Sequence, residues 1–301
     1  MKKLLLVLSL VLLTGMARAQ VKIWEGLDVS NGRLVKLTSF LAEDNPTGTA
    51  VIVCPGGSYY WLDKKNEGDS VAMWLQNNGI SAFVLEYRAA GIPAFAFRHR
   101  AIFRGRRYPD MITDAQRALQ WVRTHADEYH INPDKVGMVG FSAGGHLVTS
   151  VACFHNHDYL KDIGIDNHTN LRPDFVGAIY PVVTMVKPYV HKRSRRGLLS
   201  EQYHRNPWMC DSLSLEQHIP ADCPPIFIAN CIDDPVVDYR NSVILDSALT
   251  AANIPHRYVQ FKTGGHSFGA SEKRGTQESR QWKTEFLKWL TEIKFYDNTK
   301  K

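Results

Sequence analysis

Long hydrophobic runs, internal repeats and low-complexity tracts are missing from this chain of 301 residues. Its most apolar run, residues 4–13, is about half as long as a membrane-spanning helix requires. No linker-like segment divides the sequence, so a string of tethered modules is not expected. These absences favour a globular chain built around one continuous core.

Cysteine is also scarce, and the five residues cannot all pair within one chain because their number is odd. Cys54 and Cys231 end apolar runs and Cys153 follows a predicted helix, so we expect these three to be buried free thiols. Cys210 and Cys223 share a loop-rich region where they could pair. The sequence leaves this pairing open, because a disulfide requires two Cα atoms within about 7 Å.

The N-terminus has the pattern of a secretory signal peptide. Lys2 and Lys3 precede the apolar run, and Ala17-Arg18-Ala19 precedes Gln20, as at a cleavage site. We therefore expect residues 1–19 to be removed and the mature protein to be periplasmic or secreted. No cysteine lies near the cleavage point to carry a lipid anchor, and no membrane span is expected after removal.

Residues 20–301 are predicted to form a single catalytic domain, because about 280 residues can bury one large α/β core. Short apolar runs predict strands at Val51–Cys54, Ala82–Tyr87, Val136–Phe141, Phe175–Tyr180, Ile226–Cys231 and Arg257–Phe261. Helical periodicity between them predicts helices at Ser70–Asn77, Met111–Tyr129, Ser242–Ala252 and Glu278–Leu290. This alternation predicts an α/β fold with a mostly parallel central sheet and helices on both faces. Val35–Leu41 is expected to add an antiparallel edge strand.

The strand predicted to end at Phe141 is followed by Ser142 and by a helical stretch from His146 to Val151. A strand, a sharp turn at a serine and a helix form a nucleophile elbow, which needs small residues around the serine. Such residues are present at Gly140, Ala143 and Gly144. We therefore predict Ser142 as the nucleophile, and a glycine-rich turn with an inert serine is the alternative.

Loops after the carboxyl ends of parallel strands are where ligands bind in such a sheet. The first of them is Pro55-Gly56-Gly57-Ser58-Tyr59, in which two glycines allow the backbone to turn and to aim N–H groups inward. Together with the N–H of Ala143, these groups suit an oxyanion hole. A plain Gly-Gly turn is the alternative.

An acid and a histidine are expected after later strands, in that order. Asp234 follows the strand predicted to end at Cys231 and fits best as the acid that orients the imidazole. Asp233 and Asp238 are the alternatives, and Asp238 also suits a cap of the helix that begins near Tyr239. His266 lies in a glycine-rich loop after the last predicted strand and is the candidate base.

These motifs occur at residues 55–59, 140–145, 233–237 and 264–269, and in this order they resemble the α/β-hydrolase fold family. More narrowly, the chain resembles the bacterial esterase/lipase branch related to hormone-sensitive lipase and to feruloyl and acetyl-xylan esterases, over roughly Val51–Leu290. The resemblance implies an α/β-hydrolase with the nucleophile, acid and base at Ser142, Asp234 and His266, and with oxyanion donors at Gly57, Ser58 and Ala143.

One motif departs from the family pattern. The related lipases have His-Gly-Gly-Gly where this chain has Pro55-Gly56-Gly57-Ser58. The backbone donors survive this change, but whether Gly57 or Ser58 donates is left open. Relatives among the carbohydrate esterases often have proline at this position, so the change favours them over lipases.

Two segments, 89–108 and 185–223, are predicted to be insertions that rise from the carboxyl ends of strands near Ser142. Nine of the eleven Lys and Arg residues in them are Arg98, Arg100, Arg104, Arg106, Arg107, Lys192, Arg193, Arg195 and Arg196. Without these nine, the charge of the mature chain would change from +3 to −6. We predict that Tyr59 and the five arginines of the first segment bind an anionic substrate. A solvated loop is the alternative.

Together these features predict a secreted serine carbohydrate esterase. Its substrate would be an acetyl or methyl ester on a plant cell-wall polysaccharide or oligosaccharide, for example an anionic one such as pectin or glucuronoxylan. The alternatives are a feruloyl esterase, a general short-chain carboxylesterase and, more remotely, a non-catalytic carbohydrate-binding protein on the same fold. The mechanism requires no metal or cofactor, and a nucleic acid partner is not expected. The oligomeric state is left open.

Overall fold

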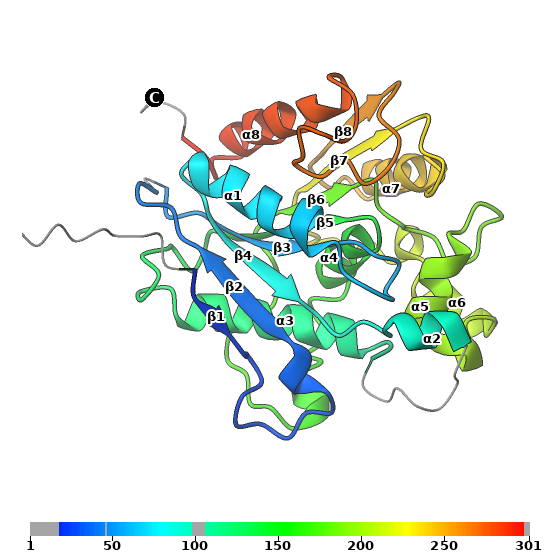
Figure 1. Cartoon of the computed structure of the whole chain (residues 1–301), viewed down its shortest axis with the longest axis horizontal. Coiled ribbons are helices and arrows are strands. Elements are labelled where there is room, and N and C mark those ends of the chain that lie inside the picture. Colours follow the sequence, from blue (N-terminus) through cyan, green and yellow to red (C-terminus); the bar gives the residue numbers. More distant parts are fainter. Residues whose placement is uncertain (1–17, 46, 98–105, 298–301) are drawn as a thin grey trace, which may run out of the picture.

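The computed structural model of the protein describes residues 18–45, 47–97 and 106–297. Within these residues an eight-stranded sheet has the order β1-β2-β4-β3-β5-β6-β7-β8 (Figure 1). The strands are β1 (Gln20–Val21), β2 (Lys36–Phe40), β3 (Ala50–Cys54), β4 (Ser81–Glu86), β5 (Val136–Phe141), β6 (Val176–Ile179), β7 (Ile226–Cys231) and β8 (His256–Phe261). Strands β3 to β8 pair in parallel, and β1 and β2 are antiparallel to their neighbours.

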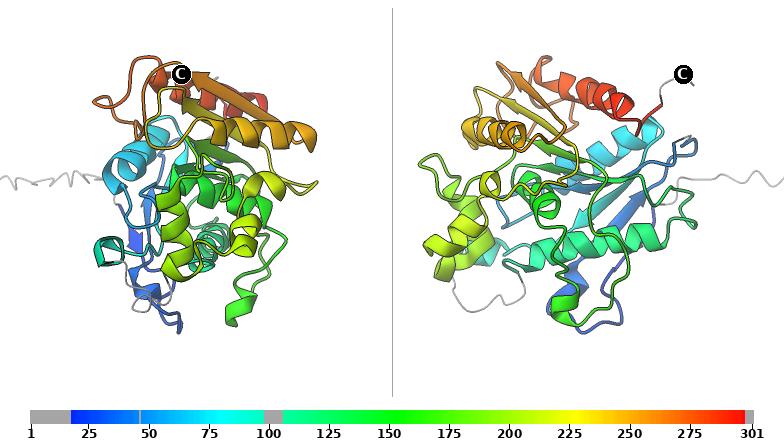
Figure 2. Two further views of the ribbon diagram at one scale, coloured as in Figure 1. Left: turned by 90° about the vertical axis from the view of Figure 1, so that its right-hand side faces the viewer. Right: turned by 180° about the vertical axis from the view of Figure 1, so that it is seen from behind.

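Helices cover both faces of this sheet (Figure 2). They are α1 (Ser70–Asn77), α2 (Ile92–Phe97), α3 (Asp110–Thr124), α4 (Ala143–Cys153), α5 (Lys192–Tyr203), α6 (Pro207–Ser212), α7 (Arg240–Ala251) and α8 (Trp282–Glu292). Short 3-10 or π turns are η1 (Gly32–Leu34), η2 (Lys64–Asp69), η3 (Lys161–Ile163), η4 (Leu215–Gln217) and η5 (Ser279–Gln281).

The core has two layers because the sheet is covered on both sides. Side chains of α3, α4 and α7 pack in one layer with strand residues such as Ile52 and Met138. Side chains of α1 and α8 pack in the other layer with Val51 and Val139. Successive side chains of a strand point to opposite faces, so a strand covered twice must be apolar at nearly every position. This requirement explains the continuous apolar runs in the sequence.

The predicted α/β architecture is confirmed, and each predicted strand agrees with the structure to within one residue at either end. The strand predicted over Val35–Leu41 is antiparallel as expected, but it is not the edge, because β1 pairs along its outer side. The helix predicted to reach Tyr129 ends at Thr124, and turns carry the chain from there toward β5.

The two predicted insertions, 89–108 and 185–223, are called the rim segments below. They contain three helices that were not predicted, namely α2, α5 and α6. Figure 1 shows them gathered at one end of the molecule, beyond the carboxyl ends of the parallel strands. Helix α5 reads Lys-Arg-Ser-Arg-Arg at its start and has no continuous apolar stripe, so its periodicity gives no helical signal. Ser200, with φ of 67°, also interrupts its regular geometry.

The cysteines are all free and buried. The pairing considered for Cys210 and Cys223 is therefore wrong. The thiol of Cys210 donates to the carbonyl of His204 at 3.4 Å. The thiol of Cys223 instead lies in hydrogen-bond contact with that of Cys153, and this contact and burial raise the pKa of Cys153.

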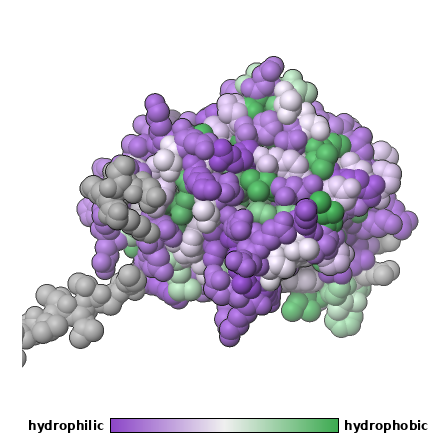
Figure 3. All heavy atoms as spheres, turned by 90° about the horizontal axis from the view of Figure 1, so that it is seen from above, coloured by the Kyte–Doolittle hydropathy of each residue, from purple (hydrophilic) through white to green (hydrophobic). Residues whose placement is uncertain are grey.

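The surface is mostly hydrophilic on the face shown in Figure 3, where hydrophobic residues lie in small separate groups. Among the residues that the structure describes, the most exposed large apolar side chains are Ile92, Phe97 and Trp208, which are 67%, 71% and 75% exposed. All three belong to the rim helices α2 and α6. In the part of the chain that the structure describes, no helix has both the length and the apolarity to span a membrane.

His146 links helix α4 to two loops from other parts of the chain. Its Nδ1 lies 2.8 Å from the hydroxyl of Tyr59, and its Nε2 lies 3.0 Å from the carbonyl oxygen of Leu213. A carbonyl only accepts, so Nε2–H donates to Leu213 and Nδ1 accepts from the tyrosine. Burial lowers the pKa of His146 to about 4, so the ring is neutral at pH 7.

This burial predicts a pH-dependent stability. The folded state holds His146 at a pKa of about 4, whereas an unfolded histidine has a pKa of about 6.5. Between these values the unfolded state binds the extra proton, so stability is lost as the pH falls below about 6.5. By pH 4 the loss should approach about 3 kcal/mol for this residue.

Urea unfolding of the wild type and of His146→Gln at pH 7 and pH 5 measures this contribution. The variant should be less stable than the wild type at pH 7, because one of its contacts changes. Its stability should nevertheless fall less between pH 7 and pH 5. Equal pH dependence in the two proteins would show that His146 does not titrate in this range.

Candidate active site

Ser142 lies at the sharp turn between strand β5 and helix α4. Its backbone has φ of 54° and ψ of −116°, which is a strained conformation for a residue with a side chain. The helix returns very close to the sheet, and a Cβ at Gly144 would lie 2.1 Å from the carbonyl oxygen of Cys54. A Cβ at Gly140 would lie equally close to the carbonyl oxygen of Gly144. The small residues seen in the sequence are therefore required by this approach.

His266 connects Ser142 to Asp234. The Nε2 atom of His266 lies 2.9 Å from the Oγ of Ser142, and its Nδ1 lies 2.6 Å from Oδ2 of Asp234. The other carboxylate oxygen of Asp234 accepts from the N–H groups of Val236 and Val237, at 2.8 and 3.0 Å. The Asp234 side chain is fully buried, and that of His266 is 8% exposed. The structure thus brings the three predicted residues into one hydrogen-bonded chain.

The two alternative acids lie elsewhere. Asp233 accepts from the N–H groups of Gly264 and Gly265, at 3.2 and 2.8 Å, and so holds the loop that carries His266. Asp238 accepts from the N–H of Arg240 at 3.0 Å, at the start of helix α7. Both carboxylates thus bond to backbone N–H groups, and only Asp234 among the three contacts His266.

The predicted oxyanion donors Gly57, Ser58 and Ala143 lie in a strained loop and at a helix start. Gly57 and Ser58 have φ of 138° and 55°, and Ala143 is the first residue of α4. In the described part of the chain, none of their three N–H groups donates a hydrogen bond. An N–H group left free beside a nucleophile can bind a developing negative charge.

The residues predicted to contact the substrate are only partly described by the structure, and one of them is buried. Tyr59 is fully buried and its hydroxyl donates to His146, so its side chain is not available to a substrate, and this prediction is corrected. Its ring belongs to the core beneath the loop of residues 55–59, which we call the predicted oxyanion loop. Arg98, Arg100 and Arg104 lie outside the described residues. Of the remaining two, the guanidinium of Arg107 lies 5.1 Å from the ring centre of Tyr203, and Arg106 lies near Gly91.

Glu67 and Tyr180 were not predicted as site residues, although they connect two parts of the site. Glu67 is 1% exposed and accepts from the N–H of Gly56 at 2.8 Å and from the hydroxyl of Tyr180 at 2.9 Å. That hydroxyl also accepts from the N–H of Gly269 at 3.0 Å. Burial raises the pKa of Glu67, and the two donors oppose this shift.

The ring of Tyr180 also packs on the imidazole of His266, with 4.6 Å between ring centres. The buried carboxylate of Glu67 therefore joins the predicted oxyanion loop to the loop of residues 262–269 that carries His266, which we call the histidine loop. Glu67 and Tyr180 are 113 residues apart, so no local sequence pattern connects them.

His191 is a second residue that sequence reasoning did not assign. It precedes helix α5, and its Nδ1 shares a hydrogen bond of 2.7 Å with the hydroxyl of Ser194. Burial lowers its pKa to about 4, and a proton on His266 would lower it further. His191 is therefore a neutral group at the border of the site.

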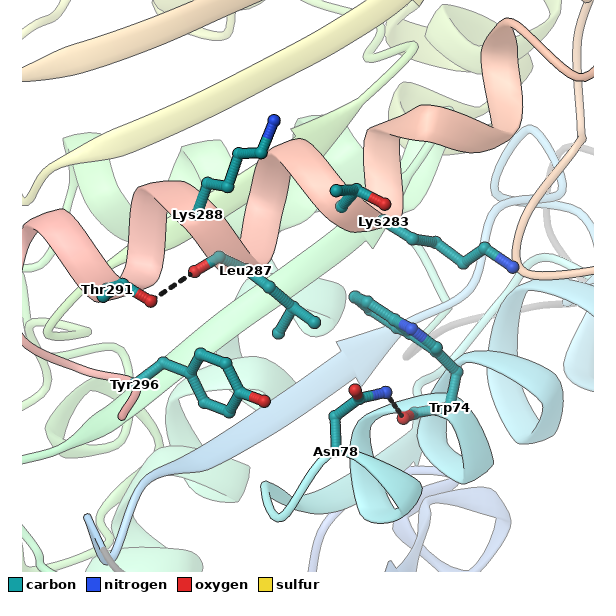
Figure 4. A pocket seen from close by; sticks show the side chains of 8 residues that line it. Trp74, Asn78, Lys283, Leu287, Lys288, Thr291 and Tyr296 are labelled. Atoms are coloured by element: carbon teal, nitrogen blue, oxygen red, sulfur yellow. Dashed lines mark hydrogen bonds between the residues drawn. The ribbon is translucent and has the colours of Figure 1, made fainter. Parts of the chain in front are cut away.

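A separate cavity of about 400 Å³ lies between helices α1 and α8 (Figure 4). Trp74 and Tyr296 flank it, and Lys283 and Lys288 extend from α8 beside it. None of the predicted site residues lines this cavity. Across the described ranges, no group of three or more His, Cys, Asp or Glu side chains is arranged to hold a metal ion.

Comparison with known proteins gives a family match that covers more than half of the chain. A family model described as BD-FAE matches residues 40–249. This range contains Ser142, Asp234 and the predicted oxyanion donors, and it ends before His266.

Two curated relatives are similar over most of this chain. An acetylxylan esterase of Xylanibacter ruminicola is 28% identical over 271 residues, which are 89% of this chain and 51% of the relative. Endo-1,4-beta-xylanase B of Butyrivibrio fibrisolvens is 31% identical over 256 residues, which are 83% of this chain and 38% of the relative. The chain thus spans about half of the first relative and less than half of the second.

A solved structure is similar over nearly its whole length. It is an acetyl ester-xyloside bifunctional hydrolase from Caldicellulosiruptor lactoaceticus, with a TM-score of 0.80 and 28% sequence identity. The match covers 93% of this chain and 98% of that one. The fold is therefore that of the α/β-hydrolase esterases.

The acid assignment can be tested with two isosteric variants. Asp234→Asn should lower kcat for p-nitrophenyl acetate about a thousandfold or more, because an amide no longer favours the histidine tautomer and cation that the reaction needs. Asp233→Asn is the matched control, since its amide oxygen can still accept from Gly265, although the weaker bond from Gly264 to the other oxygen is lost, and the side chain does not contact His266. It should lower kcat less than tenfold. A reversed order of the two effects would assign the acid to Asp233.

Glu67→Gln tests the link between the two loops. Gly56 and Tyr180 donate to different oxygens of Glu67, and an amide keeps an acceptor at only one of these two positions. We expect kcat to fall about tenfold to a hundredfold with little change in KM, because the loops are displaced by fractions of an ångström. Glu86→Gln, which removes a partly exposed partner of Lys64, is the control. Unchanged kcat in Glu67→Gln would remove the residue from the site.

Proposed function

The chain belongs to the BD-FAE family, and from this premise we propose that it is a serine esterase that cleaves small esters on a plant cell-wall polysaccharide. The observation that carries the proposal is the hydrogen-bonded chain from Ser142 through His266 to Asp234, with distances of 2.9 and 2.6 Å. The N–H groups of Gly57, Ser58 and Ala143, which donate to no acceptor among the described residues, add to it. A relative named acetylxylan esterase supports the substrate class.

The first half of the reaction forms an acyl-enzyme. His266 accepts the proton of the Ser142 hydroxyl at Nε2 while Oγ attacks the ester carbonyl carbon. The carbonyl oxygen becomes an oxyanion that the N–H groups of Gly57 or Ser58 and of Ala143 bind. The C–O bond to the alcohol then breaks, and His266 returns the proton to the departing oxygen.

The second half releases the acid. A water molecule gives a proton to His266 and attacks the acyl carbon to form the second tetrahedral intermediate. The bond from the acyl carbon to Oγ then breaks, His266 returns the proton to Oγ of Ser142, and the carboxylic acid is released. Asp234 keeps Nδ1 protonated throughout and stabilises the imidazolium. The protein's own side chains account for every proton that moves in this scheme.

The leading substrate is an acetyl group on a sugar hydroxyl, for which the polysaccharide is the alcohol and leaves first. The second is a methyl ester of a uronic acid, as in pectin, for which methanol leaves first and the sugar carboxyl becomes the acyl group. Glucuronoxylan and pectin both carry free uronates that basic rim residues can pair with. Secretion, as expected from residues 1–19, would place the enzyme with such polymers.

The substrate panel consists of acetylated xylan, pectin and feruloylated arabinoxylan, with release of acetate, methanol and ferulate as the readout. We expect acetate release to dominate and Ser142→Ala to lower kcat at least about a thousandfold, because no other nucleophile replaces the serine. Unchanged melting temperature would show that the variant is folded.

Two results would count against the proposal. Acetate release that survives in Ser142→Ala would mean that another group attacks the ester. Ferulate release without acetate release would reassign the enzyme as a feruloyl esterase.

A further inference from the structure

Helix α5 packs directly on the predicted oxyanion loop. A Cβ at Gly197 would lie 2.3 Å from the carbonyl oxygen of Ser58, so the helix can approach this closely only because Gly197 has no side chain. Helix α5 therefore borders the site at Ser142.

Six basic residues of α5 and of the turn after it line a pocket of about 460 Å³, which we call the α5 pocket. They are Lys192, Arg193, Arg195, Arg196, His204 and Arg205. This volume lies within the range of small-molecule sites in proteins. None of these residues was among the arginines predicted to bind substrate from the first rim segment.

The positive charge of the α5 pocket is poorly neutralised. In the described chain, the ion pairs of these residues go to Glu201 alone, whose carboxylate lies 3.1 Å from Nε of Arg196 and 3.5 Å from Nε2 of His204. Arg195 donates to the carbonyl of Met185, and its buried Nε has no hydrogen-bond partner. Five Lys and Arg side chains against one carboxylate leave an excess of four charges, which favours a bound anion.

Aromatic rings continue the pocket toward the oxyanion loop. Tyr60, Trp61 and Phe95 form a cluster with ring centres 5.4 to 6.4 Å apart. Arg196 donates to the hydroxyl of Tyr60 at 2.8 Å, and the guanidinium of Arg193 lies 5.7 Å from the ring centre of Phe95. Aromatic faces and edges suit sugar rings, and guanidinium groups suit carboxylates.

We propose that the α5 pocket binds the carboxylate of a uronic acid residue in the polysaccharide whose ester is cleaved at Ser142. This inference rests on the proposed function and adds a second contact between the enzyme and an acidic chain. A polysaccharide without uronic acid residues has no carboxylate for the pocket to bind. Guanidinium groups also bind an inorganic anion such as phosphate, so the test distinguishes binding of a uronate from binding of phosphate.

The kinetic test compares an acetylated xylo-oligosaccharide that carries a glucuronate branch with the same oligosaccharide without it. The variant Lys192→Gln/Arg193→Gln/Arg205→Gln neutralises three exposed side chains of the α5 pocket. We expect its KM for the branched substrate to rise at least about tenfold more than its KM for the neutral one, with kcat little affected.

The control variant Lys22→Gln/Arg33→Gln/Lys161→Gln removes the same charge from exposed positions away from α5. It should leave both KM values within about twofold of the wild type. An equal rise of KM for both substrates in the pocket variant, or the same selective rise in the control, would overturn the proposal. The first would indicate a general defect and the second long-range attraction.

A binding test separates failure of the pocket from failure of the proposed function. Calorimetric titration of Ser142→Ala with the de-esterified glucuronate oligosaccharide requires no hydrolysis. Binding that is lost in the pocket variant, and that phosphate at equal concentration does not displace, supports the uronate site. Full displacement by phosphate, or equal affinity for the neutral oligosaccharide, would overturn it even if the enzyme hydrolyses acetylated xylan.

Discussion

The left-handed backbone of Ser142 is the constraint on which the site depends. A serine at φ of 54° stores strain that costs roughly 1–3 kcal/mol, so the surrounding fold must hold it in place. The N–H of Ser142 donates to the carbonyl of Ile179 at 3.0 Å, and its carbonyl accepts from His146 and Val182. Gly140 and Gly144 allow the elbow to close. The strand, the turn and the helix thus fix the position of Ser142 without a contribution from a bound substrate.

The other candidate catalytic groups are held by carboxylates that bond to the backbone. Asp234 has one oxygen on His266 and the other on two N–H groups, so its position is fixed from both sides. Asp233 holds the start of the histidine loop, and Glu67 holds its far end through Tyr180. Because Glu67 also bonds Gly56, movement of the histidine loop and of the oxyanion loop is coupled. The site is therefore one unit rather than three separate loops.

The rim differs from the core in what stabilises it. Helix α5 has few buried apolar side chains and is anchored at Gly197 against the oxyanion loop and at Arg196 against Tyr60. Its excess positive charge is unfavourable for the empty protein and favourable for an acidic ligand. In the proposed function, the fold carries the ester chemistry and the charged rim gives a basis for selecting among polysaccharides. These two properties can vary independently, since they lie on different elements.

The sequence by itself determined the strands, the elbow and the order of the candidate nucleophile, acid and base, because these are local patterns of apolar runs, glycines and reactive side chains. The tertiary structure alone decided that Asp234 rather than Asp233 reaches His266, that Tyr59 is buried, and that Cys223 lies beside Cys153. It also decided the bond between Glu67 and Tyr180, which are 113 residues apart. Such contacts depend on how distant segments pack together, and the spacing of residues along the chain does not encode that packing.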